Sequence, residues 1–523
     1  MGAQGSLGAR HACTWQHHCH SGDPCSSPVA IAGAVVERLR SAKCRGGAVA
    51  IYRVLLLVAL LFTAAACTAG NDSPQTAAAG ASLPSARGVP ALPPAIERDV
   101  GAAYPDAALQ AYVDRVGQKL VRAAGLSGPY RFVVLDLPVV NAHALPPGYV
   151  FVTRGLLAAL DDEAELAAAL AHEIGHLTQR HAAQRAQVRR GVLEAAVEAA
   201  AATGSVTVGR SVARDGLLAL RRYSRDQELE ADRIGLAYLV QAGYRSSAMA
   251  SLIDRLQQQS RLEAQLLGEV PDSFDQRSAT STHPAPFERK GALLAAGVSA
   301  AGESGRSAYL AAIDGMSVDD APDEGFVHGR AFLHPKLRLA FEAPADFRLF
   351  NDPDGVLGVG RDRSLLFFSC SNDRVPGRLD DSMRNTLKPT PADIQATQIG
   401  GAEAAIGARP RGSDTGLGQA RYVMVRHGDR ICFFNLLSEG PDRDRRIEVL
   451  VNAARTFRAL TAAEAAALRP YRLRVIMAAG TSPAQLAARL PYDDLRMERL
   501  LTLNGVDTTA ELARLSQIKI VEP

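Results

Sequence analysis

The stretch from Glu165 to Arg185 constrains the fold of this chain more than any other. Its sequence, ELAAALAHEIGHLTQRHAAQR, is rich in alanine and predicts a buried helix. Asp162, followed three residues later by Glu165, is a typical N-terminal cap, so we expect the helix to begin there. His172 and His176 then lie about 40° apart around the helix and one turn apart along it. Two imidazoles in this arrangement can bind one metal ion.

His172, Glu173 and His176 form the pattern H-E-x-x-H, which on a helix is the signature of zinc metalloproteases. Glu173 can reach a metal-bound water and accept its proton. His181 lies nine residues past His172, about 180° around the helix, so we expect it not to share the ion. The alternative interpretation of the two H-E-x-x-H histidines is that both are buried structural residues.

A catalytic zinc ion takes three protein ligands and keeps one position for water, so a third ligand must come from elsewhere. The stretch from Tyr223 to Tyr244, YSRDQELEADRIGLAYLVQAGY, predicts a second helix. Ser224 and Gln227 form a capping box at its start, and Gly243 marks its end.

Glu228 and Asp232 are four residues apart on this second helix and therefore share a face, whereas Glu230 points about 200° away from Glu228. We therefore expect Glu228 to be the third ligand of one zinc ion per chain. Asp232 is expected to accept a hydrogen bond from a ligand histidine and fix its ring. A solvated helix face is the alternative interpretation of the two acidic residues.

Four ordered motifs resemble the zinc metallopeptidase family that includes HtpX and the CAAX prenyl endoprotease, and most closely its exported BepA-like branch. They are HEIGH at 172–176, ELEAD at 228–232, NAHALPPGYVFVTRGLL at 141–157, in which Pro147 replaces a glycine, and THPAPFER at 282–289. The resemblance implies a zinc-dependent endopeptidase that cleaves unfolded or misassembled envelope proteins. It also implies a mostly helical, zincin-type protease domain with a small β-sheet.

The resemblance further implies that His283 and Arg289 lie over the cleft. Arg289 would stabilise the oxyanion of the tetrahedral intermediate. We expect His283 to fill the fourth metal position until its loop moves, which would gate the site. Alternatively, His283 contacts the substrate or is only a loop residue. The strand YVFV at 149–152 is expected to pair with an extended substrate by strand addition.

The segment from Val54 to Cys67, VLLLVALLFTAAAC, indicates export. It is too short to span a bilayer, which takes about 20 residues, and it matches the apolar region of a secretory signal. A cysteine directly after three alanines resembles a lipoprotein signal, so we expect Cys67 to be lipidated and the protein to be periplasmic, anchored to the outer membrane. Plain export and an uncleaved anchor are the alternatives.

Composition and patterning predict an α+β chain with several units. These are a leader and signal (1–67), a disordered linker (68–95), the metallopeptidase domain (96–302), a linker (303–325), an α+β domain of unknown role (326–460) and a small final module (465–523). Cys370 and Cys432, the two cysteines after Cys67, lie in strand-like runs and are either paired or two buried free thiols.

The final module reads strand–helix–helix–strand and resembles LysM, a βααβ fold that binds peptidoglycan. The usual Gly-Asp-Thr is reduced here to Ala479-Gly480-Thr481, which leaves glycan binding open. A net charge of +3 with scattered basic residues, and 5% aromatic residues, exclude nucleic acid as a partner. Two other functions remain open: a chaperone with a latent zinc site, and a peptidoglycan-associated scaffold lipoprotein.

Overall fold

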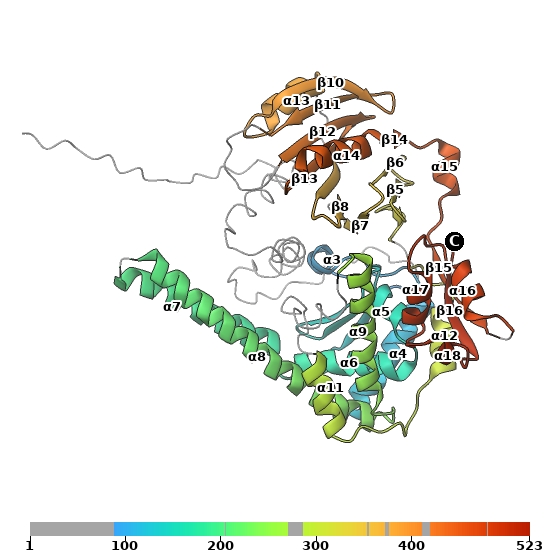
Figure 1. The fold of residues 1–523 in the computed structure, drawn as a ribbon. Coiled ribbons are helices and arrows are strands. Elements are labelled where there is room, and N and C mark those ends of the chain that lie inside the picture. The colour runs from blue at the N-terminus through green and yellow to red at the C-terminus, as the bar shows by residue number, and fades with distance from the viewer. Residues whose placement is uncertain are drawn as a thin grey trace, which may run out of the picture.

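The computed structural model describes residues 88–203, 205–269, 286–318, 320–352, 355–371, 376–409, 419–478 and 480–523. Within these residues the chain is α+β, as predicted, with a helical part, a β-sheet part and a small C-terminal module (Figure 1). The expected leader and signal, 1–67, lie outside the described residues. None of the described helices is long and apolar enough to cross a membrane.

The helical part surrounds a small sheet. Its helices are α3 (Pro94–Val100), α4 (Ala107–Ala123), α5 (Arg154–Ala159), α6 (Glu163–Thr178), α7 (His181–Thr203), α8 (Val206–Gln241), α9 (Ala248–Leu266), α11 (Pro286–Ala295) and α12 (Arg306–Ile313). The strands β1 (Arg131–Leu135), β2 (Ala142–Leu145) and β3 (Tyr149–Thr153) lie in the order β1-β3-β2, with β1 parallel and β2 antiparallel to β3. The strand expected to pair with substrate, β3, is therefore central and already paired on both edges.

Helix α6 lies at the centre of the helical core. It begins where predicted, because the Asp162 side chain accepts a hydrogen bond from the Glu165 amide at 2.9 Å. The Glu165 carboxylate accepts from the amide of Asp161, at 2.8 Å, rather than from the cap residue. Every residue of α6 from Ala164 to His176 is buried, since short alanine side chains let neighbouring elements approach from all sides.

Helix α8 is longer than predicted. It starts at Val206 and runs without a break past Ser224, where the sequence analysis placed its beginning. Residues 217–222, LLALRR, are good helix formers and continue the helix through Ser224. Gln227 donates instead to the side chain of Gln184 on α7. Helices α7 and α8 form an antiparallel hairpin that projects from the rest of the protein (Figure 1). The helix ends as predicted, with Gly243 at a positive φ of 83°.

The segment 303–325, expected to be a linker, contains part of the helical core. Helix α12 lies within it, and its Tyr309, Leu310 and Ile313 are fully buried against α4 and α6. These apolar residues share one helix face, and their burial attaches the segment to the first unit.

The β-sheet part contains a seven-stranded antiparallel sheet of order β10-β11-β12-β13-β9-β8-β7 and a four-stranded sheet of order β14-β6-β5-β4. Its elements are β4 (Phe326–His328), β5 (Ala331–His334), β6 (Leu339–Glu342), β7 (Phe347–Asp352), β8 (Gly355–Gly360), β9 (Leu365–Ser371), α13 (Leu379–Thr386), β10 (Ala392–Ile399), β11 (Ala402–Ala408), β12 (Gln419–His427), β13 (Arg430–Ser438), α14 (Arg443–Arg455) and β14 (Arg458–Ala459). Cys370 and Cys432 face each other on β9 and β13 and form a disulfide, the first of the two alternatives left open by the sequence.

The C-terminal module follows α15 (Ala462–Ala467). It comprises β15 (Arg472–Met477), α16 (Pro483–Arg489), α17 (Arg496–Leu503), α18 (Thr509–Leu512) and β16 (Gln517–Glu522), with β15 antiparallel to β16. The module packs on the helical part through β16. The ammonium of Lys519, fully buried, donates to the carbonyls of Ala158 and Leu160 and pairs with Asp161 at 3.1 Å.

Candidate metal centre

Two glycines bring α6 and α8 close enough to share a metal ion. A Cβ atom added at Gly235 of α8 would lie 3.0 Å from backbone atoms of Ala171 and His172, and one at Gly175 would lie 3.0 Å from the carbonyl oxygen of Ala231. Contacts this close to backbone atoms leave no room for a side chain. The backbones of the two helices therefore nearly touch beside the H-E-x-x-H motif.

This packing places three potential ligands around one point. Nε2 of His172 lies 3.1 Å from Nε2 of His176, and the Glu228 carboxylate oxygens lie 3.3 Å and 3.4 Å from these two nitrogens. All three side chains are buried, and their donor atoms lie within 4.8 Å of one another. The structure brings together the three residues that the helical spacing selected.

The far ring nitrogen of each histidine contacts a second residue. Nδ1 of His172 lies 2.8 Å from the Asp232 carboxylate, as the sequence predicts for an orienting acceptor. Nδ1 of His176 lies 2.8 Å from Nδ1 of His181, whose Nε2 lies 3.3 Å from the Glu230 carboxylate. Both Nε2 atoms are therefore left to face the ligand position, and the outer contacts fix the ring orientations.

His181 is a site residue that sequence reasoning missed. It is not one of the three residues whose donor atoms converge, but it is completely buried against His176. The helix does not continue from α6 to His181, because Arg180 adopts a positive φ of 55° and α7 begins anew. One continuous helix would place His181 about 180° from His172. The break at Arg180, which brings His181 against His176, cannot be derived from helical spacing.

Arg289 lies elsewhere than the resemblance implied. Its buried guanidinium makes two hydrogen bonds to the Asp232 carboxylate, both 2.7 Å long, and lies 3.6 Å from Glu228. This bidentate geometry is the strong form of the arginine–carboxylate pair. The Arg289 side chain, which was expected over the cleft, thus hydrogen-bonds to Asp232, the carboxylate that contacts His172. His283 lies outside the described residues, so its expected position over the metal is not seen.

Burial and neighbouring charges divide the site into groups of different basicity. Burial and Arg289 lower the pKa of His172, but hydrogen bonds with Asp232 and Glu228 outweigh them and raise it to about 9. Burial lowers the pKa of His176 to about 4. Although burial alone would raise the pKa of Asp232, Arg289 holds it well below its usual range. The carboxylates of Glu228 and Asp232 thus favour a positive charge at His172, and a divalent cation bound here would meet the same two negative groups.

The donor set fits zinc in number and kind. Two imidazole nitrogens and one carboxylate oxygen are ligands that zinc binds, and three protein ligands leave a position for water. Glu173 follows the first of these histidines in the helix and is itself buried. Its charge acts on both His176 and Arg289, which places the carboxylate beside the site without making it part of the ligand set.

Known proteins match this part of the chain. Residues 107–296, which contain α4 to α9 and all of α11, match Peptidase family M48. We refer to residues 107–296 as the M48 segment. The M48 segment includes all three ligands, Glu173, Asp232 and Arg289, and zinc is the metal of this family.

The chain is also similar to individual curated proteins. It is 33% identical over 168 residues to a putative beta-barrel assembly-enhancing protease of Vibrio cholerae, covering 30% of this chain and 34% of that protein. It is 29% identical over 196 residues to the beta-barrel assembly-enhancing protease of Escherichia coli strain K12, and the match covers 35% of this chain and 38% of that protein. It is 36% identical over 147 residues to the mitochondrial metalloendopeptidase OMA1 of Schizosaccharomyces pombe, and the match covers 28% of this chain and 43% of that protein. The matches span well under half the length of these curated relatives.

Proposed function

We propose that the protein is a zinc-dependent endopeptidase that cleaves unfolded or misassembled proteins of the bacterial envelope. The observation that carries the proposal is the buried group of His172, His176 and Glu228, with Glu173 next to the first ligand. The relatives named as beta-barrel assembly-enhancing proteases and metalloendopeptidases support the reaction and the substrate class.

The mechanism assigns each side chain of the site one task. His172, His176 and Glu228 would hold a zinc ion, which when bound would supply a Lewis acid and lower the pKa of water toward about 7. Glu173 takes the proton of the attacking water and passes it to the leaving amine. Asp232 and His181 hold the imidazole rings, and Arg289 fixes Asp232. In this scheme Arg289 is a positioning residue, because its Nε and one terminal amino group donate to the Asp232 carboxylate.

An extended substrate has one sheet edge available near the site. Strand β2 lies at the edge of the small sheet and against α6, whereas β3 is enclosed between β1 and β2. We therefore assign strand addition to β2 rather than to the YVFV strand. Pairing at an edge uses backbone hydrogen bonds, which suits unfolded polypeptides of varied sequence.

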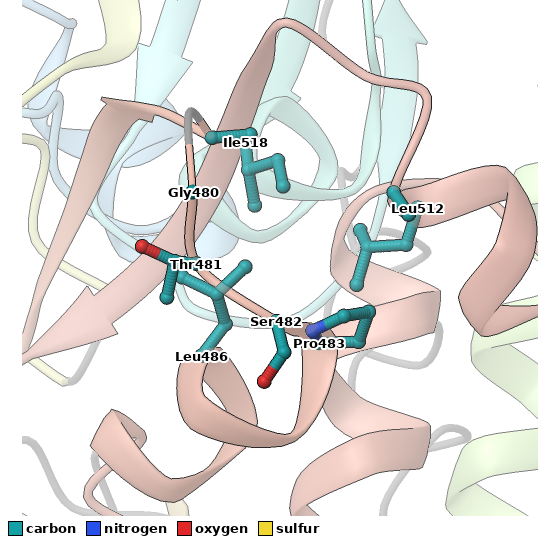
Figure 2. A pocket seen from close by; sticks show the side chains of 9 residues that line it. Gly480, Thr481, Ser482, Pro483, Leu486, Leu512 and Ile518 are labelled. Atoms are coloured by element: carbon teal, nitrogen blue, oxygen red, sulfur yellow. The ribbon is translucent and has the colours of Figure 1, made fainter.

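The chain's location and its other contacts extend the same proposal. Lipidation of Cys67 would anchor the protein to the periplasmic face of the outer membrane, a role supported by the apolar run before this cysteine. The C-terminal module contains a pocket of about 350 Å³ between the turn at Gly480–Pro483 and the residues Leu512 and Ile518 (Figure 2). Such a pocket is a candidate site for a peptidoglycan sugar, which would place the protease at the cell wall. His283 remains the proposed gate of the metal site.

The test compares the full chain with Glu173→Gln. Because Glu173 is not a ligand, the variant should retain one zinc ion per chain while cleavage of casein falls by about 100- to 10,000-fold. Glu194→Gln, an exposed glutamate of α7, is the matched control and should change neither quantity. A wild-type protein that binds zinc, leaves casein intact and suppresses its aggregation would instead be a chaperone with a latent site.

A further inference from the structure

The α7–α8 hairpin (residues 181–223) has a charge distribution unlike that of the rest of the chain. It contains seven arginines and three acidic residues, so its formal charge of +4 exceeds the +3 of the whole protein. The arginines flank its tip: Arg189 and Arg190 precede it on α7, and Arg210 and Arg214 follow it on α8. All four side chains are exposed, although Arg214 pairs with Asp215.

The tip itself is uncharged and partly apolar. Residues 199–209, AAAATGSVTVG, contain no charged side chain. Just before them, Leu193 and Val197 are 51% and 69% exposed, and Val208 is 39% exposed on the other helix. Leu193 and Val197 are four residues apart and share a face of α7, and Arg189 lies one turn earlier on that same face. On this face of α7, a positively charged residue therefore lies further from the tip, and apolar residues lie closer to it.

The hairpin is closely packed and stands clear of the core. A Cβ at Gly209 would lie 2.6 Å from the carbonyl oxygen of Ala196, and one at Gly216 would lie 2.5 Å from Val192. These glycines let the two helices approach closely at both points. Among the described elements, α7 packs mainly on α8, and the hairpin projects away from the other helices (Figure 1).

We propose that the tip of the α7–α8 hairpin docks on an anionic lipid surface. On one face of α7, Arg189 comes before the exposed Leu193 and Val197, whereas the exposed Glu194 and Glu198 lie on the adjoining face. On the first face this order matches that of headgroup phosphate and acyl chain in a bilayer leaflet. Val197 lies about 10 Å beyond Arg190 along the helix axis, comparable to the depth at which interfacial helices bury their apolar face. No described helix can span a membrane, so the contact is peripheral. This inference goes beyond the proposed proteolysis and does not depend on it.

The experiment places a fluorescent reporter at the tip of the full chain. The chain has a single tryptophan, Trp15, so a Trp15→Phe background carrying Val197→Trp reports on this position alone. On addition of phosphatidylglycerol vesicles, the emission of the reporter should move to shorter wavelength, and brominated acyl chains should quench it. Val240→Trp is the matched control, because Val240 is 54% exposed but lies at the opposite end of α8. Its emission should not change, even if the N-terminal apolar segment holds the protein on the vesicle.

Charge reversal tests the electrostatic part of the proposal. Adding Arg189→Glu and Arg190→Glu to the Val197→Trp reporter should raise, several-fold, the concentration of phosphatidylglycerol vesicles that gives half of the maximal emission shift. With the unchanged reporter, phosphatidylcholine vesicles should give no emission shift. The proposal is overturned by an unchanged spectrum at position 197, by equal shifts at 197 and 240, or by equal response to both lipids. A short-wavelength emission at 197 without vesicles, which disappears on dilution, would mean that a second copy of the chain covers the tip.

Discussion

Glu228 and Glu230 are two residues apart on α8, and the structure gives them different surroundings. The Glu228 side chain is 1% exposed and faces both Nε2 atoms, whereas the Glu230 side chain is 44% exposed and contacts only His181. Glu228→Ala should therefore weaken zinc binding by more than about 100-fold, beyond the roughly 10- to 100-fold typical of outer contacts. Glu230→Ala should keep stoichiometric zinc. Zinc titration of both variants checks this, and reversed behaviour would contradict the ligand assignment.

At this scale the sequence identifies the ligands and one support, Asp232, but not the supporting contacts of His181 and Arg289. His172, His176 and Glu228 follow from helical spacing, because that spacing is a local property of the chain. The contacts of His181 and Arg289 depend on how α7 and α11 pack against α6 and α8. The helical repeat within one segment of sequence contains no information on this packing. The signal available for His181 was its position three residues after the end of α6, where a chain reversal can return a side chain to the preceding turn.

Helices α6 and α8 are held at their separation by Gly175 and Gly235. A methyl group at Gly235 meets the backbone of Ala171 and His172, so Gly235→Ala must push α8 outward and move Glu228 away from the histidines. We expect a loss of about 1–3 kcal/mol in the free energy of unfolding and weaker zinc binding. Thermal unfolding and zinc titration provide the two readouts.

Gly191 on α7 provides the matched control for this change. A Cβ at Gly191 meets nothing within 4 Å, so Gly191→Ala should leave zinc binding unchanged and raise stability by up to about 1 kcal/mol through helix propensity. Equal effects of the two substitutions would show that close approach of the backbones is not what forms the site.

The positions of α6 and its cap were predictable from sequence, whereas the start of α8 was not, because Ser224 has the same capping chemistry inside a helix as at its end.

Across the whole molecule, the C-terminal module is attached to the metallopeptidase part at the start of α6. Lys519 of β16 is buried against Asp161 and two backbone carbonyls, and Arg255 of α9 donates to the carbonyl of Gly505. Burial lowers the pKa of Lys519, and Asp161 opposes that shift. The order of units along the chain was predictable from composition. This attachment was not, because it joins residues at least 250 positions apart.

Removing the charge of Lys519 tests the importance of this attachment. Lys519→Met keeps the side-chain length but leaves Asp161 without its buried cation, so the free energy of unfolding should fall by about 3–5 kcal/mol. Lys336→Met is the control, because Lys336 pairs with Asp323 at the surface, and its effect should stay below about 1 kcal/mol. Denaturant unfolding measures both. A Lys519→Met protein as stable as the control would mean that the module is not held at this contact.

The most direct test of the account is the metal content of the purified full chain, measured together with casein cleavage before and after chelation. The account predicts one zinc ion per chain, cleavage that stops when a chelator removes the zinc, and recovery when zinc is returned. A chain that contains no zinc, or that cleaves casein equally well after the metal has been removed, would contradict it.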